Sequence, residues 1–116
     1  MSSGNQKQVR HQKRSKLHSA SPDGHRAEEL AELFLEFENK AEFKAFLLDF
    51  LTSVERKELW ERWCIVDLLL SGVAQRDIRD ELGISISKVT RGSRAIQTGT
   101  GAFVKLWQKR KYAQKS

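Results

Sequence analysis

The sequence predicts an all-α protein, and three observations support this fold class. The 116 residues are enough for one ordinary domain. They include one proline and seven glycines among many Leu, Ala, Glu and Lys residues. Apolar residues recur every three or four positions without alternating runs, which favours helices over strands. We therefore expect one helical domain over residues 26–112, between a basic arm at 1–25 and a basic tail at 113–116.

The N-terminal arm, residues 1–25, is polar and basic, with almost no large apolar side chains. Such a segment buries too little surface to offset the entropy lost on ordering, so we expect it to be disordered. Its histidines lack cysteine or acidic companions at ligand spacing, so we expect no metal site.

Several features point to a reducing, water-filled compartment. The first 20 residues have no apolar stretch that could act as a signal sequence. No apolar run approaches the roughly 20 residues needed to span a membrane. A single cysteine, Cys64, cannot form an internal disulfide. We expect a soluble cytoplasmic protein without membrane contacts.

Two strongly apolar helices are predicted after the arm. The first begins near Ala27, and its apolar face holds Leu30, Leu33, Phe34 and Phe37. After a break at 39–42, the second carries Phe43, Phe46, Leu47, Phe50 and Leu51 at the same spacing. Phenylalanines at this density more often build a core than a cofactor pocket. In so short a chain we expect two subunits to share that core.

The third helix has a well-marked start and end. Thr52 and Glu55 are spaced as a capping box, in which each side chain accepts a hydrogen bond from the other residue's backbone. Gly72 is placed to end the helix. Trp60 and Trp63 on this helix, and Trp107 further on, are expected to be core residues.

Residues 75–94 are predicted to form a helix-turn-helix. Gly83 supplies the positive φ that a tight turn requires, Ser85 caps the second helix, and Val89 packs it onto the first. The N-terminal part of a recognition helix offers small side chains to base edges in the major groove, as Ile86, Ser87 and Thr90 would. A plain helical hairpin is the alternative.

The charge pattern favours DNA as the partner. The net charge is +6, and no Asp or Glu follows Glu81. A one-signed C-terminal third suits a polyanion, although a basic surface kept for solubility is the alternative. The predicted helix-turn-helix holds five cations, which are Arg76, Arg79, Lys88, Arg91 and Arg94.

Residue order adds a family resemblance. The matching residues are Leu51-Thr52, Glu55-Arg56, Arg62, Ile65-Val66, Gln75-Arg76, Glu81 to Gly83 and Val89-Thr90-Arg91-Gly92-Ser93. Over about residues 45–107 the chain resembles the bacterial tryptophan repressor family. The resemblance implies about six helices per subunit and an intertwined homodimer, with L-tryptophan as corepressor. It also implies that two reading heads dock in successive major grooves of operator DNA, a family feature that the resemblance supplies.

The resemblance assigns roles to individual residues. Arg62 and Arg91 would lie on either face of the indole ring, and Gly92 would leave room beside it. Ala95 stands where the family commonly has a serine near the ligand's amino group. Leu51 and Thr52 would reach the ligand from the other subunit. With Lys88 and Arg94 added for their charge, the predicted DNA-binding residues are Arg76, Arg79, Ile86, Ser87, Lys88, Thr90 and Arg94.

The sequence therefore predicts a homodimeric DNA-binding transcriptional repressor activated by L-tryptophan. We expect no enzymatic activity, because the chain shows no nucleophile beside a base, no metal-ligand cluster and no glycine-rich loop after a strand. One alternative is a regulator of the same fold with a different ligand or none. The other is a helical protein-interaction module whose basic ends serve solubility.

Overall fold

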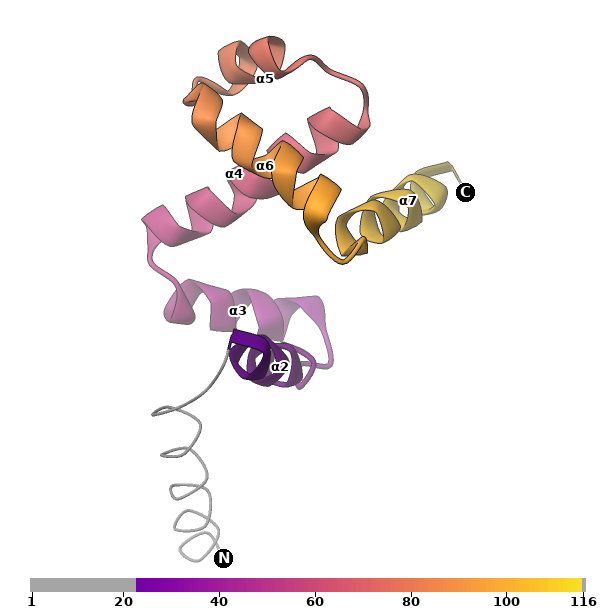
Figure 1. Cartoon of the computed structure of the whole chain (residues 1–116). Coiled ribbons are helices and arrows are strands. Elements are labelled where there is room, and N and C mark those ends of the chain that lie inside the picture. Colours follow the sequence, from indigo (N-terminus) through magenta and orange to yellow (C-terminus); the bar gives the residue numbers. More distant parts are fainter. Residues whose placement is uncertain (1–22, 116) are drawn as a thin grey trace, which may run out of the picture. The chain divides into compact units, whose positions relative to one another are not determined.

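The computed structural model describes residues 23–115, which form six helices and no strands (Figure 1). This confirms the predicted all-α fold. The helices are α2 (Asp23–Phe34), α3 (Lys40–Phe50), α4 (Ser53–Leu70), α5 (Gln75–Leu82), α6 (Ile86–Thr98) and α7 (Ala102–Lys115). In this part of the chain, no helix is long and apolar enough to cross a membrane.

The ends of the chain differ in part from the predicted boundaries. Residues 1–22 of the predicted arm and Ser116 lie outside the described residues. The last three residues of the predicted arm belong to α2, which begins at Asp23. The predicted tail is helical as far as Lys115. The chain divides into two compact units, one up to Asp49 and one from Phe50 on, and each is described by itself.

The first unit is held together by phenylalanine rings. The Phe34 and Phe43 ring centres lie 5.3 Å apart, and Phe46 packs on the edge of Phe34 at 6.1 Å. Phe37, predicted on the first helix, instead lies in the loop between α2 and α3. From there it stacks on Phe43, with ring centres 5.3 Å apart.

The loop position of Phe37 follows from a cap at Asn39. The Asn39 Oδ1 atom accepts a hydrogen bond from the Glu42 backbone N–H at 2.9 Å, and its Nδ2 atom donates to Glu42 Oε2 at 3.0 Å. Asn39 therefore starts α3, whereas the sequence pattern places the second helix after a break at 39–42. The interruption between the helices falls earlier, after Phe34.

The apolar faces of the first unit are only partly covered within one chain. Leu30 and Leu33 on α2 are 43% and 41% exposed, and Leu48 on α3 is 52% exposed. No residue of α3 is fully buried. The rings contact one another, but most of the leucine surface around them remains open to solvent.

The second unit begins at the cap of α4. Thr52 Oγ1 accepts from the Glu55 backbone N–H at 3.1 Å, and Glu55 Oε1 accepts from the Thr52 backbone N–H at 2.9 Å. The predicted capping box is confirmed. The helix ends at Leu70 and is followed by Gly72 with φ +88°, which confirms that this glycine terminates it.

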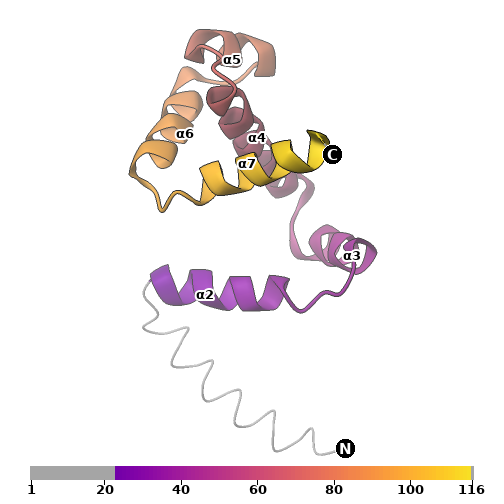
Figure 2. The ribbon, with the colours of Figure 1, turned by 90° about the vertical axis from the view of Figure 1, so that its right-hand side faces the viewer.

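Helices α5, α6 and α7 each pack against α4 (Figures 1 and 2). Ile65 of α4, Ile78 of α5 and Val89 of α6 form the buried core. The residues packed around these three are Leu68, Leu69, Val73, Leu82 and Ile84. This small core fixes the α5–α6 pair on the C-terminal half of α4.

The turn between α5 and α6 has the predicted local geometry. Gly83 has φ +64°, and its backbone N–H donates to the Arg79 carbonyl at 2.9 Å. Ser85 precedes α6, and its hydroxyl oxygen accepts from the Lys88 backbone N–H at 3.4 Å. The predicted glycine turn and serine cap are confirmed. Val89 is fully buried, as expected.

Helix α7 is anchored to α4 by a tryptophan. Trp107 Nε1 donates to Asp67 Oδ1 at 2.8 Å, and Lys111 Nζ lies 4.8 Å from the centre of the Trp107 ring. Trp60 behaves differently, because its side chain on α4 is 63% exposed. Its expected place in the core is wrong for the single chain.

Candidate functional site

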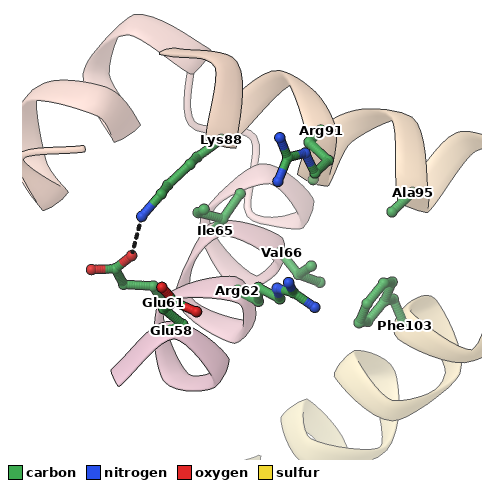
Figure 3. A pocket seen from close by; sticks show the side chains of 10 residues that line it. Glu58, Glu61, Arg62, Ile65, Val66, Lys88, Arg91, Ala95 and Phe103 are labelled. Atoms are coloured by element: carbon green, nitrogen blue, oxygen red, sulfur yellow. Dashed lines mark hydrogen bonds and ion pairs between the residues drawn. The ribbon is translucent and has the colours of Figure 1, made fainter. Parts of the chain in front are cut away.

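A cavity of about 300 Å³ lies between α4, α6 and the start of α7, all within the second unit. Figure 3 shows Arg62 reaching into this space from α4 and Arg91 reaching into it from α6. Gly92 and Ala95 of α6 also line it. The structure thus brings together four of the six predicted ligand-binding residues.

Helical spacing explains why these residues converge. On α4, Glu58, Arg62 and Ile65 follow one another at intervals of four and three, so they share one face. On α6, Lys88, Arg91 and Ala95 are spaced by three and four and form the facing wall. The cavity is therefore the space between two matched helix faces.

Gly92 has a packing role as well as a place in the cavity wall. A Cβ atom at this position would lie 2.7 Å from Cγ2 of Ile65, closer than real Cβ contacts come. Ile65 is 3% exposed and has little room to move. The absence of a side chain at Gly92 lets α6 approach α4 closely, and this approach sets the width of the cavity.

Lys88 lies with the cavity residues. Its Nζ atom is 3.2 Å from Glu61 Oε1, an ion pair that joins α6 to α4 (Figure 3). The Lys88 side chain is 47% exposed and that of Glu61 is 20% exposed, so the pair stabilises the fold by about 1 kcal/mol or less. Lys88 therefore lies apart from the other predicted DNA-binding residues of α6.

The cavity wall includes residues that sequence reasoning did not single out, namely Glu58, Glu61, Ile65, Val66 and Phe103. The first four lie at helical spacing around Arg62, so once Arg62 was chosen its neighbours on the same face could have been found. Phe103 comes from α7, and no local signal in the sequence connects it to Arg62.

The charges in the cavity are unevenly paired. Glu61 is bonded to Lys88. Within residues 23–115, Arg62, Arg91 and Glu58 have neither a hydrogen bond nor an ion pair through their side chains. Guanidinium groups stack on aromatic rings and bind carboxylates, and apolar walls bury rings. The cavity is thus chemically suited to an aromatic or apolar carboxylate.

The outer face of α6 carries a second set of predicted residues. Ile86, Thr90 and Arg94 are spaced by four, and with Ser87 they form an exposed strip away from the cavity. The Thr90 hydroxyl has two acceptors within hydrogen-bond distance, Gln75 Oε1 at 3.2 Å and the Ile86 carbonyl oxygen at 3.1 Å. Through the first of these it ties α6 to α5.

The arginines of α5 differ from each other. Arg76 is exposed at the start of α5. Arg79 Nε donates to Asp80 Oδ1 at 2.9 Å, and its side chain is 41% exposed. Arg76 is therefore the more available cation on this helix.

Leu51 and Thr52, also predicted to bind the ligand, do not line this cavity. Thr52 is engaged in the cap of α4, and the Leu51 carbonyl accepts from Arg56 Nη1 at 2.6 Å. Their predicted role requires a second subunit, so it stays a prediction.

The described residues hold no group of three or more potential metal ligands. Cys64 is free and partly buried, and desolvation raises the pKa of its thiol, with smaller contributions from Asp67 and Glu61. A raised thiol pKa disfavours the thiolate, which is the nucleophilic form. This cysteine is therefore poorly suited to covalent chemistry.

Comparison with known proteins gives consistent matches. A family model described as Trp repressor protein matches residues 25–111. A Trp operon repressor homolog of Chlamydia trachomatis serovar L2 is 37% identical over 81 residues, covering 66% of this chain and 86% of that relative. A Trp operon repressor homolog of Chlamydia caviae is 41% identical over 56 residues, covering 47% and 55%. No solved structure matches the chain.

Proposed function

This chain belongs to the Trp repressor protein family, and we propose from that premise that it represses transcription by binding operator DNA as a homodimer loaded with L-tryptophan. One observation carries the proposal. Arg62 and Arg91, 29 residues apart in the sequence, both extend into one cavity that borders α6. A ligand held there would contact the helix whose opposite face is proposed to read DNA.

The cavity supports an aromatic amino acid as the ligand. Its volume of about 300 Å³ lies at the small end of the range for small-molecule pockets, which suits a single amino acid. Either arginine could stack on an indole ring while the other binds the carboxylate. Val66, Ala95 and Phe103 supply apolar surface for the ring.

Contact with two helices gives the ligand a way to control DNA binding. A ligand shifts a conformational equilibrium only by as much as it favours one state. Tryptophan would bridge Arg62 on α4 and Arg91 on α6, so it would favour the orientation of α6 in which both contacts form. That orientation is the one in which two reading heads would match successive major grooves.

The outer strip of α6 supports DNA binding. Ile86 and Ser87 lie in its first turn and Thr90 one turn on, where recognition helices contact base edges. The exposed guanidinium groups of Arg76 and Arg94 flank the strip and suit phosphate contacts, which position a protein on the duplex.

A homodimer is supported by apolar surface that one chain leaves uncovered. Within residues 23–115, four hydrophobic side chains are fully buried, whereas Leu33, Leu48, Leu59 and Trp60 are each at least 41% exposed. A second copy could bury this surface and supply the core that the single chain lacks.

The ligand part of the proposal is tested by calorimetry at low salt, titrating L-tryptophan into the full-length protein. We expect saturable binding that Arg91→Ala abolishes or weakens severely. Arg94→Ala is the matched control, because Arg94 lies on the same helix but on the outer strip. It should bind tryptophan like the unaltered protein and bind DNA more weakly.

A folded dimer that binds no tryptophan would contradict this ligand assignment. It would leave a regulator that responds to another effector or to none. Equal loss of tryptophan binding in Arg91→Ala and Arg94→Ala would mean that general positive charge, and not the cavity contact, attracts the ligand.

A further inference from the structure

The charged and apolar side chains of the cavity gather at different ends. In Figure 3 the Lys88–Glu61 pair lies at one end of the site and Phe103 at the other, with the two arginines between them. Glu58 lies on the same face of α4 as Glu61 and Arg62. This arrangement suits a ligand with a charged head and an apolar body.

The unpaired charges specify the head more closely. Glu61 and Lys88 neutralise each other, and within the described part of the chain this leaves two guanidinium groups and the Glu58 carboxylate unpaired. A ligand with a single carboxylate would satisfy an arginine but would bring a second negative charge close to Glu58. A ligand carrying both a carboxylate and an ammonium group would satisfy charges of both signs.

The spacing of Glu58 and Arg62 fits such a head. They are four residues apart on α4, so their Cβ atoms are about 5–6 Å apart on one helix face. An α-amino acid carries its ammonium and carboxylate groups on the same carbon atom. Such a head could therefore contact both side chains at once. On the facing wall, Ala95 offers no side-chain acceptor for an ammonium group.

We propose that Glu58 accepts a hydrogen bond from the ligand's ammonium group and makes the cavity select an aromatic α-amino acid over the matching acid without the amino group. This inference rests on the proposed function, since it concerns the same cavity. It adds a specificity-determining residue that the sequence comparison did not indicate.

Two probes of matched shape test this proposal: L-tryptophan and 3-(indol-3-yl)propanoic acid, which lacks the amino group. Their affinities are measured by calorimetry on the full-length protein and on Glu58→Gln. We expect the unaltered protein to prefer tryptophan by about tenfold, within the range for a charged hydrogen bond at an exposed position. Glu58→Gln should lose most of that preference, mainly by weakening tryptophan.

Glu61→Gln is the matched control, because it removes the same charge from the same wall at a carboxylate that is already paired. It should change the two affinities together and leave their ratio near that of the unaltered protein. Glu58 is exposed and glutamine is a good helix former, so circular dichroism should show unchanged helix content in Glu58→Gln.

Three outcomes would overturn the inference. If both variants reduce the preference equally, total charge and not a contact at Glu58 sets it. If the unaltered protein binds both probes with equal affinity, the cavity binds indole carboxylates as proposed, and the selective role of Glu58 alone fails. If the folded protein binds neither probe, the proposed ligand fails, and the role of Glu58 fails with it.

Discussion

Gly92 carries the tightest steric constraint of any single residue in the cavity wall. Replacing it with alanine would place a Cβ atom 2.7 Å from Ile65 Cγ2, and Ile65 is buried. Overpacking costs about 1–3 kcal/mol, and the better helix propensity of alanine recovers up to about 1 kcal/mol. We expect Gly92→Ala to lower the free energy of unfolding by about 1 kcal/mol, measured by urea denaturation at fixed protein concentration.

The control for this prediction is Gly24→Ala. A Cβ atom there would meet nothing within 4 Å, so stability should not fall. If Gly92→Ala is as stable as the unaltered protein and binds tryptophan normally, close approach of α6 to α4 does not shape the cavity.

Thr90 is the residue whose substitution tests base reading. A DNA site is first selected from randomised duplexes in the presence of L-tryptophan. Thr90→Ala should then weaken binding to that site by about 1–3 kcal/mol, the usual discrimination of a base contact. Because Thr90 also bonds Gln75, the control is Gln75→Ala, which removes the same α5–α6 bond but leaves the Thr90 hydroxyl in place. An equal loss in both variants would assign the effect to the bond between the helices.

Single residues also show what can be predicted from sequence. Thr52, Gly83 and Ser85 were predictable because caps and turns depend on neighbours within a few positions. The placement of Lys88 was missed, because a cation on a recognition helix suggests DNA unless its helical position is considered. Three residues before Arg91, it lies on the cavity face, and its partner Glu61 is 27 residues away along the chain.

Among the helices, α4 has the best-defined start, and that start gives a pH dependence. Hydrogen bonds from the Thr52 backbone and then its side chain lower the pKa of Glu55 below its ordinary value of 4.5. A lowered folded-state pKa contributes stability that is present above the unfolded value and lost as pH falls through the folded value. The contribution of Glu55 should therefore be complete at neutral pH and disappear in acid.

Thermal unfolding across this acid range tests the cap. We expect Glu55→Gln to be less stable than the unaltered protein at pH 7, with the difference shrinking in acid. Thr52→Ala should cost about 1 kcal/mol at pH 7, as is usual for loss of a hydroxyl cap. A constant difference between Glu55→Gln and the unaltered protein at all pH values would show that the carboxylate charge has no part in the cap.

The boundary between α2 and α3 shows why helix ends are hard to predict. Apolar periodicity continues through Phe37, so the pattern extends the first helix too far. Asn39 has an acidic residue three positions later, a pairing that competes for the start of a new helix. The phenylalanine spacing was correctly interpreted as packing, because these rings do contact one another.

At the scale of the whole molecule, the exposed apolar surface predicts self-association. Sedimentation equilibrium should give twice the chain mass of 13.4 kDa at micromolar concentration. Trp60→Glu should shift the protein toward monomers, because Trp60 is 63% exposed and a charge would be costly to bury in an interface. A monomer of the unaltered protein at these concentrations would contradict the dimer.

The site as a whole could be predicted only in part. Residue order identified Arg62, Arg91, Gly92 and Ala95, because a family motif specifies residues that meet in space. Phe103 and the Asp67–Trp107 bond depend on how α7 packs, and no local pattern determines that packing.

Ligand-dependent DNA binding is the central claim, and it is tested by the affinity for the selected duplex with and without L-tryptophan at one fixed salt concentration. We expect tryptophan to tighten binding by about tenfold or more, within the usual range of coupling between two sites. The same measurement on Arg91→Ala should show no such gain. Equal affinity of the unaltered protein with and without tryptophan would contradict the claim.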